Sequence, residues 1–277
     1  MTIRKVLISL MVCAGFYSIP VLGQQYKIAS AGGSITETIY ALGRESVIVA
    51  VDSSSQYPAS VTTLPQFGYF RQISPEGIIS TGATHVFAAK GFGPESAVEQ
   101  LSSLGMNVEI FDVPRTVPGL HTMIRQIGAK LDAATESEAL IASIDKDIAT
   151  IVKKSTQSRQ TTVAFLMSVT DHGLRAAGQD TVPHLIFDTL ELTNVFAEVN
   201  GFKSVSPETL VVTPPELIII PSHQVEGLST SDICSLQAMK LYASAKGCNV
   251  LIVDPLMFLG MTPRLADAMQ IVLNELK

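Results

Sequence analysis

The sequence predicts an α/β protein made of two Rossmann-like lobes joined by one long helix. Short apolar runs alternate with helical patterns along the chain, which is typical of parallel sheets covered by helices on both faces. A longer helical pattern interrupts this alternation at mid-chain, and the alternation then restarts. We therefore expect an N-terminal lobe at residues 24–132, a linking helix at 133–156, a C-terminal lobe at 157–277, and a ligand cleft between the lobes.

The bulk composition excludes several classes of protein. Apolar residues make up 47% of the 277 residues and charged residues only 16%, which favours a folded globule over a disordered chain. The net charge of −6 provides no electrostatic attraction to nucleic acid, so we expect no nucleic-acid partner.

Residues 1–23 form a separate segment that we interpret as a cleaved signal peptide. Arg4 and Lys5 provide a positive start, the next residues are mostly apolar, and Gly23 stands where a signal peptidase reads a small residue. An uncleaved membrane anchor is less favoured, because the tract contains Pro20 and is short for a membrane span. The sequence therefore predicts an exported protein.

Export leaves Cys234 and Cys248 as an even pair in a compartment that permits disulfides. A bridge between them and two free buried thiols are both open from the sequence, because free cysteines are also common in protein cores.

The expected first lobe begins with a strand and a helix. Ser34 and Glu37 have the spacing of a capping box at the start of this helix, and Gly43 is placed to end it. We expect strands at residues 26–31, 47–51, 85–89 and 108–113, and further helices at 95–104 and 117–131.

The linking helix follows from apolar residues at helical spacing, including Ile141, Ile144 and Ile148, after a second capping-box pattern at Thr135 and Glu138. Its length of about 30 Å is enough to run from one small lobe to another. In the second lobe we expect strands at residues 162–167, 217–221 and 250–254, and helices at 181–190 and 263–276.

A short motif occurs once in each half. Residues 73–81 and 205–213 align without a gap, and each contains Ser-Pro-Glu, with Glu76 in the first copy and Glu208 in the second. Serine is a favoured N-cap, proline a favoured first helical residue, and glutamate favours the positive end of the helix dipole. The repeat predicts two related lobes with an equivalent exposed glutamate on each.

The chemistry-bearing segment of the first lobe is Gly68-Tyr69-Phe70-Arg71. If this connection is extended, Tyr69 and Arg71 point to the same face. A fixed cation beside a phenol favours the phenolate, a hard anionic oxygen suited to ferric iron, and tyrosinate is a known haem ligand. The alternative is a packed aromatic ring beside a solvated arginine.

Histidines offer candidates for a second ligand. His172 follows a strand of the second lobe at a place equivalent to Tyr69, so it could face Tyr69 across a flat ligand, although a surface histidine is the more ordinary interpretation. His223 also follows a strand end and could reach the cleft. We expect His85 and His121 to serve packing or solvent contacts.

Five segments, taken in order, are similar to a known family. They are residues 31–37, 68–71, 175–181, 206–208 and 259–264, which read AGGSITE, GYFR, RAAGQDT, SPE and LGMTPR. This ordered set resembles the periplasmic haem-binding proteins of bacterial ABC haem importers, and the resemblance covers nearly the whole chain after the signal segment.

The resemblance implies periplasmic capture of haem and its delivery to an inner-membrane ABC permease, with an outer-membrane haem receptor system upstream. It implies that Tyr69 binds the haem iron with Arg71 beside it, and that His172 is the nearest candidate for another ligand. Phe70 is expected to cover the porphyrin.

The resemblance also implies roles for charged residues. Glu76 and Glu208 correspond to the lobe-tip glutamates that dock onto permease arginines. We expect Arg175 and Arg264 to meet the haem propionates.

Two other functions remain open. The same scaffold can carry a ferric siderophore or a corrinoid, in clefts that use arginines or aromatic residues without an iron-ligating tyrosine. An exported α/β enzyme is less favoured, because the sequence contains no nucleophile elbow, phosphate loop, zinc motif or dinucleotide fingerprint. We expect a binding protein and not an enzyme.

Overall fold

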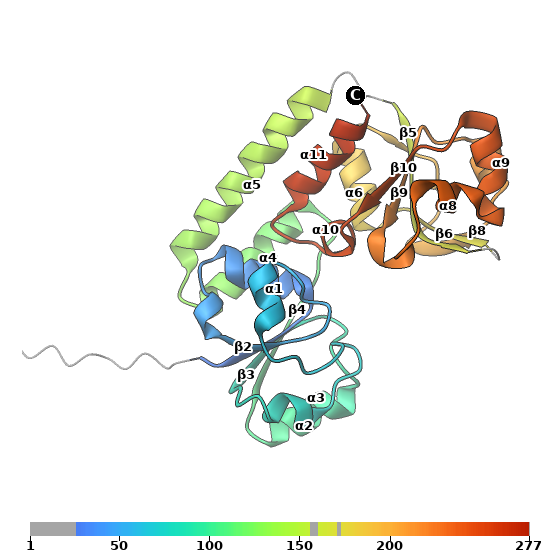
Figure 1. The fold of residues 1–277 in the computed structure, drawn as a ribbon. Helices are drawn as coiled ribbons and strands as arrows, with labels where there is room; N and C mark the ends of the chain where they lie inside the picture. Colours follow the sequence, from blue (N-terminus) through green and yellow to red (C-terminus); the bar gives the residue numbers. More distant parts are fainter. Residues whose placement is uncertain (1–25, 156–159, 171–172, 277) are drawn as a thin grey trace, which may run out of the picture.

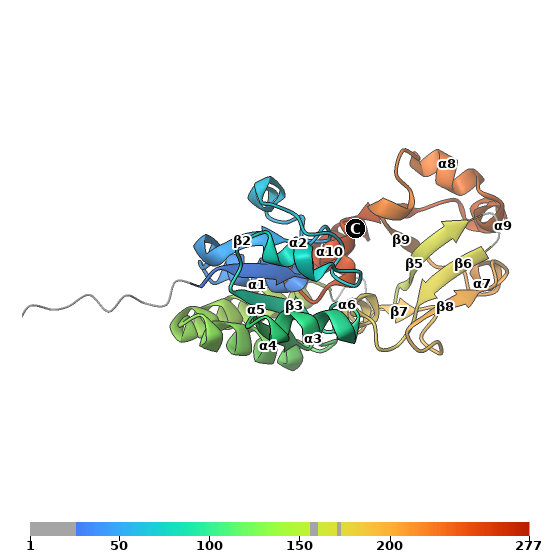
Figure 2. The same ribbon diagram turned by 90° about the horizontal axis from the view of Figure 1, so that it is seen from below.

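The computed structural model describes residues 26–155, 160–170 and 173–276, and its two-lobed α/β fold confirms the predicted class (Figures 1 and 2). The predicted signal peptide lies outside the described residues. The sheet of the first lobe is entirely parallel and has the strand order β2-β1-β3-β4. Its strands are β1 (Ile28–Ala31), β2 (Ile48–Val51), β3 (His85–Ala89) and β4 (Asn107–Phe111).

The sheet of the second lobe is mixed, which differs from the expected parallel sheet. Its order is β10-β9-β5-β6-β8, and β7 also pairs with β5. Strands β6 and β8 run antiparallel to their neighbours, because β5 continues past the predicted end and β6 pairs back onto it. The strands are β5 (Thr162–Thr170), β6 (Gly173–Ala177), β7 (Thr193–Asn194), β8 (Phe202–Val205), β9 (Leu217–Pro221) and β10 (Val250–Val253).

Helices cover both sheets, and the long helix α5 runs beside both lobes (Figure 1). It has 21 residues and packs against α4 and α11. The helices of the first lobe and the link are α1 (Gly33–Ala41), α2 (Pro75–Ile79), α3 (Glu95–Ser103), α4 (Val117–Lys130) and α5 (Ala134–Lys154). Those of the second lobe are α6 (Val182–Thr189), α7 (Thr209–Val212), α8 (Thr230–Ser235), α9 (Gln237–Lys246), α10 (Pro255–Leu259) and α11 (Leu265–Glu275). Among the described residues, none of the helices combines the length and the apolar character that a membrane span requires.

One hydrophobic core joins the lobes. The same buried cluster contains Ile28 of β1, Ile144 of α5, Phe165 of β5 and Met269 of α11. Because this cluster is continuous through α5 and α11, moving one lobe against the other would disturb packed apolar side chains.

The structure corrects two predicted helix starts. Helix α1 has Gly32 as its N-cap and α5 has Ala133, and neither has a side-chain cap. Glu37 instead binds an arginine of the second lobe, and Glu138 binds Arg125. Both glutamates have the spacing of a capping box, but each carboxylate forms an ion pair with an arginine outside its own helix instead of binding the backbone at the helix start.

The two copies of the Ser-Pro-Glu motif also differ. Ser74 is the N-cap of α2, where its hydroxyl accepts a hydrogen bond from the Gly77 N–H, and Pro75 is the first helical residue. In the second copy the helix begins later, at Thr209, with Glu208 as an N-cap that makes no side-chain hydrogen bond. The predicted cap is therefore confirmed in the first lobe and wrong at Ser206 in the second.

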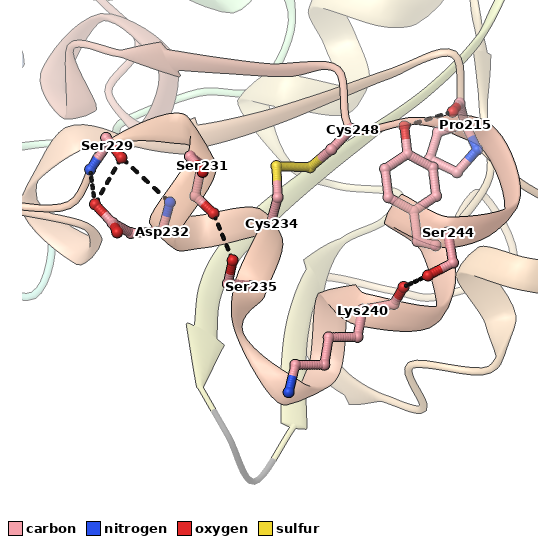
Figure 3. Close-up of a disulfide and its surroundings, with 10 residues drawn as sticks. Pro215, Ser229, Ser231, Asp232, Cys234, Ser235, Lys240, Ser244 and Cys248 are labelled. Carbon is pink, nitrogen blue, oxygen red and sulfur yellow. Dashed lines mark hydrogen bonds between the residues drawn. A yellow bond between two sulfur atoms is a disulfide. The ribbon is translucent and has the colours of Figure 1, made fainter.

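Cys234 and Cys248 form a disulfide, with their Cα atoms 6.0 Å apart (Figure 3). The bridge ties α8 to the segment after α9. Nearby, the Tyr242 hydroxyl donates a hydrogen bond to the Pro215 carbonyl. These contacts fix the helical segment that precedes β10.

Candidate ligand-binding site

A cavity of about 870 Å³ lies where the two lobes meet, a volume suited to one sizeable small molecule. In the first lobe its wall comes from loops at the carboxyl ends of β1, β2, β3 and β4. In the second lobe it comes from β5 and from the segments after β9 and β10. The lining residues include Gly32, Ser54, Tyr57, Tyr69, Phe70, Arg71, Lys90, Arg115, Met167, His223, Asp254, Leu256 and Leu259.

The segment that carries Tyr69 is anchored at both ends. Phe67 and Ile73 are buried, and the Ser53 N–H donates to the Gly68 carbonyl at 2.9 Å. The Gly93 N–H donates to the Phe70 carbonyl at 2.8 Å. Gly68 has φ of 98°, a left-handed conformation that favours glycine, so this residue allows the chain to turn toward the cavity.

Tyr69 is presented by a turn and not by an extended segment. The Gln72 N–H donates to the Tyr69 carbonyl at 2.8 Å, so the assumption of alternating side chains is wrong here. Tyr69 is 43% exposed as a residue, and its ring meets Phe70 edge-on, with ring centroids 5.1 Å apart. Within the described part of the chain, its hydroxyl makes no hydrogen bond. The phenol is therefore available to a ligand.

Arg71 lies beside this aromatic pair. Its guanidinium carbon is 4.8 Å from the centre of the Phe70 ring, and the same guanidinium passes over Gly91, where any Cβ would clash with Nη1. No described carboxylate forms an ion pair with Arg71. Its positive charge is uncompensated at the cavity wall.

Two more cations line the cavity, and both are already paired. Lys90 Nζ lies 2.8 Å from an Asp112 oxygen. Arg115 donates to the Asp180 backbone carbonyl at 2.5 Å and lies 3.4 Å from its carboxylate. Both ion pairs are exposed, so their partners are readily exchanged for a ligand carboxylate.

A second tyrosine, Tyr57, lines the cavity and stacks on Arg264. The guanidinium carbon of Arg264 lies 3.7 Å from the centre of the Tyr57 ring. Arg264 binds the Glu37 carboxylate with Nε at 2.8 Å and Nη2 at 2.5 Å, and binds Asp254 with Nη1 at 3.0 Å. Burial raises the pKa of Glu37, and the guanidinium opposes this shift by stabilising the carboxylate.

The loop before Tyr57 is organised by the buried carboxylate of Asp52. One of its oxygens accepts hydrogen bonds from the Gly32 N–H and the Ser55 hydroxyl, and the other from the N–H and hydroxyl of Ser54. The carboxyl ends of β1 and β2 are thereby tied together. Sequence reasoning missed both Asp52 and Tyr57, because they stand in a polar connection without a motif.

The histidines divide between cavity and scaffold. His223 lines the cavity as expected, and burial lowers its pKa, which favours the neutral imidazole. His172 lies outside the described residues. His85 contacts Thr84 and Asn107, and His121 pairs with Asp145, both away from the cavity wall.

Two arginines that the sequence predicted to contact the ligand, Arg175 and Arg264, are not among the residues that line the cavity. Arg175 is on β6, exposed, where it donates weakly to the Phe202 carbonyl. Arg264 lies behind Tyr57 with a side chain only 11% exposed, and each of its nitrogens already binds a carboxylate. The cationic wall is instead formed by Arg71, Lys90 and Arg115.

The two motif glutamates are exposed at the ends of short helices. Glu76 accepts a hydrogen bond from the Ser74 hydroxyl at 2.7 Å, and this bond lowers the pKa of its carboxyl. Glu208 is also exposed, at the N-terminus of α7.

Two α/β lobes that share a core and enclose a cavity at the carboxyl ends of their strands define a solute-binding protein. The comparisons agree with this class. The chain belongs to the periplasmic binding protein family, whose model matches residues 28–237.

Solved structures similar to this chain include several haem-binding proteins. The periplasmic haem-binding protein HutB of Vibrio cholerae is 28% identical, with a TM-score of 0.82 over 90% of this chain and 98% of that chain. RhuT of Roseiflexus sp. RS-1, a periplasmic haem-binding protein, is 26% identical, with a TM-score of 0.79 over 91% of this chain and 99% of that chain. The resemblance predicted from the sequence is confirmed.

Curated relatives include proteins named for another cargo. The vitamin B12-binding protein of Photorhabdus laumondii is 25% identical over 78% of this chain and 78% of its own length. Proteins similar to this chain are therefore named for two cargos, haem and vitamin B12.

Proposed function

We propose that this protein captures ferric haem in the cavity between its lobes and delivers it to an inner-membrane ABC permease. The observation that carries the proposal is Tyr69, whose half-exposed ring lines the cavity with no described hydrogen-bond partner for its hydroxyl. An anionic phenolate oxygen is a hard ligand that suits ferric iron and holds haem in proteins.

The remaining wall suits the rest of the haem. Phe70, Met167, Leu256 and Leu259 supply apolar surface for the faces and edges of a porphyrin. Arg71 has no carboxylate partner in the described ranges, so a haem propionate would neutralise it. Arg115 and Lys90 can take the second propionate, which replaces the role first assigned to Arg175 and Arg264.

A corrinoid is the second candidate, because several curated relatives are named vitamin B12-binding proteins. A corrinoid carries mainly neutral amides at its edge, and its cobalt does not require a phenolate. Of the charged side chains at the cavity wall, Lys90, Arg115 and Asp254 are each paired with a residue of opposite charge, whereas Arg71 has no described carboxylate partner. The unpaired cation favours a macrocycle that carries carboxylates, such as haem, over a neutral one.

The test is a titration of the purified protein with ferric haem, followed by its absorption spectrum and affinity. We expect a shifted main haem band and charge-transfer bands of a phenolate-ligated iron, and we expect Tyr69→Phe to lose both. Tyr40→Phe, which changes a tyrosine outside the cavity, is the matched control. An identical spectrum in wild type and Tyr69→Phe would contradict the proposal.

Competition with cyanocobalamin distinguishes the two cargos. We expect haem to bind with an excess of cyanocobalamin present, and cyanocobalamin alone to give no measurable heat in calorimetry. Tighter binding of cyanocobalamin than of haem would replace the first proposal by the second.

Delivery would use Glu76 and Glu208 as the contacts with permease arginines. The Ser74 hydroxyl lowers the pKa of Glu76, so its carboxylate is ionised at neutral pH. Exchanging both glutamates for glutamine should leave haem affinity unchanged and abolish haem-dependent growth in an iron-starved strain. Growth at the wild-type rate would exclude these two residues as docking contacts.

We infer that residues 1–23 direct export and are removed, so that the protein receives haem in the periplasm from an outer-membrane haem receptor system. We also infer that it releases haem unchanged and is not an enzyme. Mass spectrometry of the protein from a periplasmic extract tests the first inference, and recovery of intact haem after release tests the second.

A further inference from the structure

We propose that Tyr57 is an aromatic platform on which the ligand stacks, and that Arg264 is a positioning residue that holds this platform. The identity of the ligand rests on the proposed function. The platform itself rests on the contacts around Tyr57.

Tyr57 is a cavity residue with 44% of its surface exposed. The Arg264 guanidinium covers the ring at 3.7 Å from its centre, a distance well inside the range of a cation–π contact. One face of the ring is thus occupied, while the residue still contributes to the cavity wall. A flat ligand in the cavity can use the exposed part of this ring.

Arg264 cannot rotate freely beneath the ring. Its Nε and Nη2 bind both oxygens of Glu37, and its Nη1 binds Asp254. A two-point contact with one carboxylate and a third bond to another set the plane of the guanidinium. Because Glu37 belongs to α1 and Arg264 to the start of α11, the contact also fixes the two lobes relative to each other.

Stability alone does not account for this arrangement. The Glu37 side chain is 2% exposed, and a buried ion pair is often no more stabilising than well-packed apolar residues in the same place. Leucine and methionine would fill the same space without placing a positive charge below an aromatic ring. The Arg264 charge is explained if its contact serves to hold the Tyr57 ring in one orientation.

The cation also changes the ring electronically. A positive charge on one face pulls the π-electrons of the ring toward itself. The opposite face is then less negative, so it repels another electron-rich π-system less. A porphyrin is such a system. The loop that carries Tyr57 is already held by Asp52 through the two Ser54 contacts, so little ordering remains to be done when the ligand binds.

The experiment compares haem with metal-free protoporphyrin IX, which has the same faces and propionates but no iron to ligate. We expect Tyr57→Leu to weaken the binding of both compounds by a similar factor, roughly tenfold. Tyr57→Phe should bind both like wild type. The induced circular dichroism of the porphyrin band should change in Tyr57→Leu, because it depends on nearby aromatic rings.

Arg264 is tested through a double-mutant cycle with Tyr57. Arg264→Met combined with Glu37→Leu removes the buried charges together and keeps the site filled. This pair should weaken protoporphyrin binding in the wild-type background and add nothing in the Tyr57→Leu background. Full additivity would overturn the positioning role.

Two outcomes would overturn the platform: protoporphyrin binding unaffected by Tyr57→Leu, or Tyr57→Phe as weak as Tyr57→Leu, which would assign the role to the hydroxyl. A failure of the proposed function gives a different result from a failure of the platform. If Tyr69→Phe binds haem like wild type while Tyr57→Leu still loses protoporphyrin, the platform stands and iron ligation by Tyr69 does not.

Discussion

Two loops present a tyrosine to the same cavity, and they hold it in different ways. Tyr57 and Tyr69 have nearly equal exposure, 44% and 43%. Neither hydroxyl has a described hydrogen-bond partner, but Tyr57 lies against the Arg264 guanidinium, whereas Tyr69 meets Phe70 edge-on and no described cation covers its ring. The difference teaches that exposure alone does not identify the function of a cavity tyrosine. We propose that the ring face acts in Tyr57 and the phenolic oxygen in Tyr69.

The largest expected effect is on stability, through the residue behind Tyr57. Arg264→Ala leaves the Glu37 carboxylate buried without its cation, which should lower the free energy of unfolding by roughly 3–5 kcal/mol. Arg115→Ala, which breaks the exposed pair with Asp180, should cost at most about 1 kcal/mol. Urea unfolding of both variants measures the difference. Equal losses of stability would refute the prediction that Arg264 is needed to neutralise a buried carboxylate.

The next effect separates the two tyrosine hydroxyls. Tyr69→Phe should lower haem affinity by at least about 100-fold, since changes in residues that only support a metal ligand already cost about 10–100-fold. Tyr57→Phe keeps the ring and should bind haem within about threefold of wild type. Calorimetric titration of both variants gives the ratio, and a reversed order would exchange the two roles.

A smaller effect concerns the loop of Tyr57. The Asp52 carboxylate accepts four hydrogen bonds. Asp52→Asn replaces one of its two acceptor oxygens by an NH2 group, which should lower the free energy of unfolding by roughly 1–3 kcal/mol. In hydrogen exchange, the amides of Gly32 and Ser54 should lose protection, while the Gly93 amide beside the Tyr69 turn keeps it. Equal loss at all three would show that the loops are not independent.

The smallest effect is electrostatic and belongs to the Tyr69 segment. Arg71→Gln removes the uncompensated cation and should weaken haem binding roughly tenfold at low ionic strength, and less at high salt. Lys90→Gln, which changes a cation already paired with Asp112, should have a weaker effect. Haem titrations of both variants at two salt concentrations test this, and a larger loss for Lys90→Gln would reassign the propionate contact.

The sequence predicted most strands and helices to within a few residues because their signals are local. The apolar runs at His85–Ala89 and Leu217–Pro221 form β3 and β9 with the predicted bounds. The antiparallel strand β6 was missed, since its five residues resemble a connection and only their pairing with β5 makes them a strand.

The candidate site was predicted in part. Tyr69, Phe70 and Arg71 line the cavity as expected, and so does His223. Tyr57 was missed because nothing within its own loop indicates that Arg264, more than two hundred residues later, packs against its ring. For the same reason the Glu37 carboxylate was assigned to a local cap.

The sequence by itself determined the alternation of strands and helices, the two lobes with their linking helix, and the position of Tyr69 in a connection at the edge of the first sheet. Periodicity, glycines and caps act within a few residues, so they can be read along the chain. Only the tertiary structure decided that Glu37, Tyr57 and Arg264 meet, and that Arg71 remains without a carboxylate in the described chain. Such contacts depend on which side chains, far apart along the chain, are placed next to each charged group, and the packing of the two lobes decides that placement.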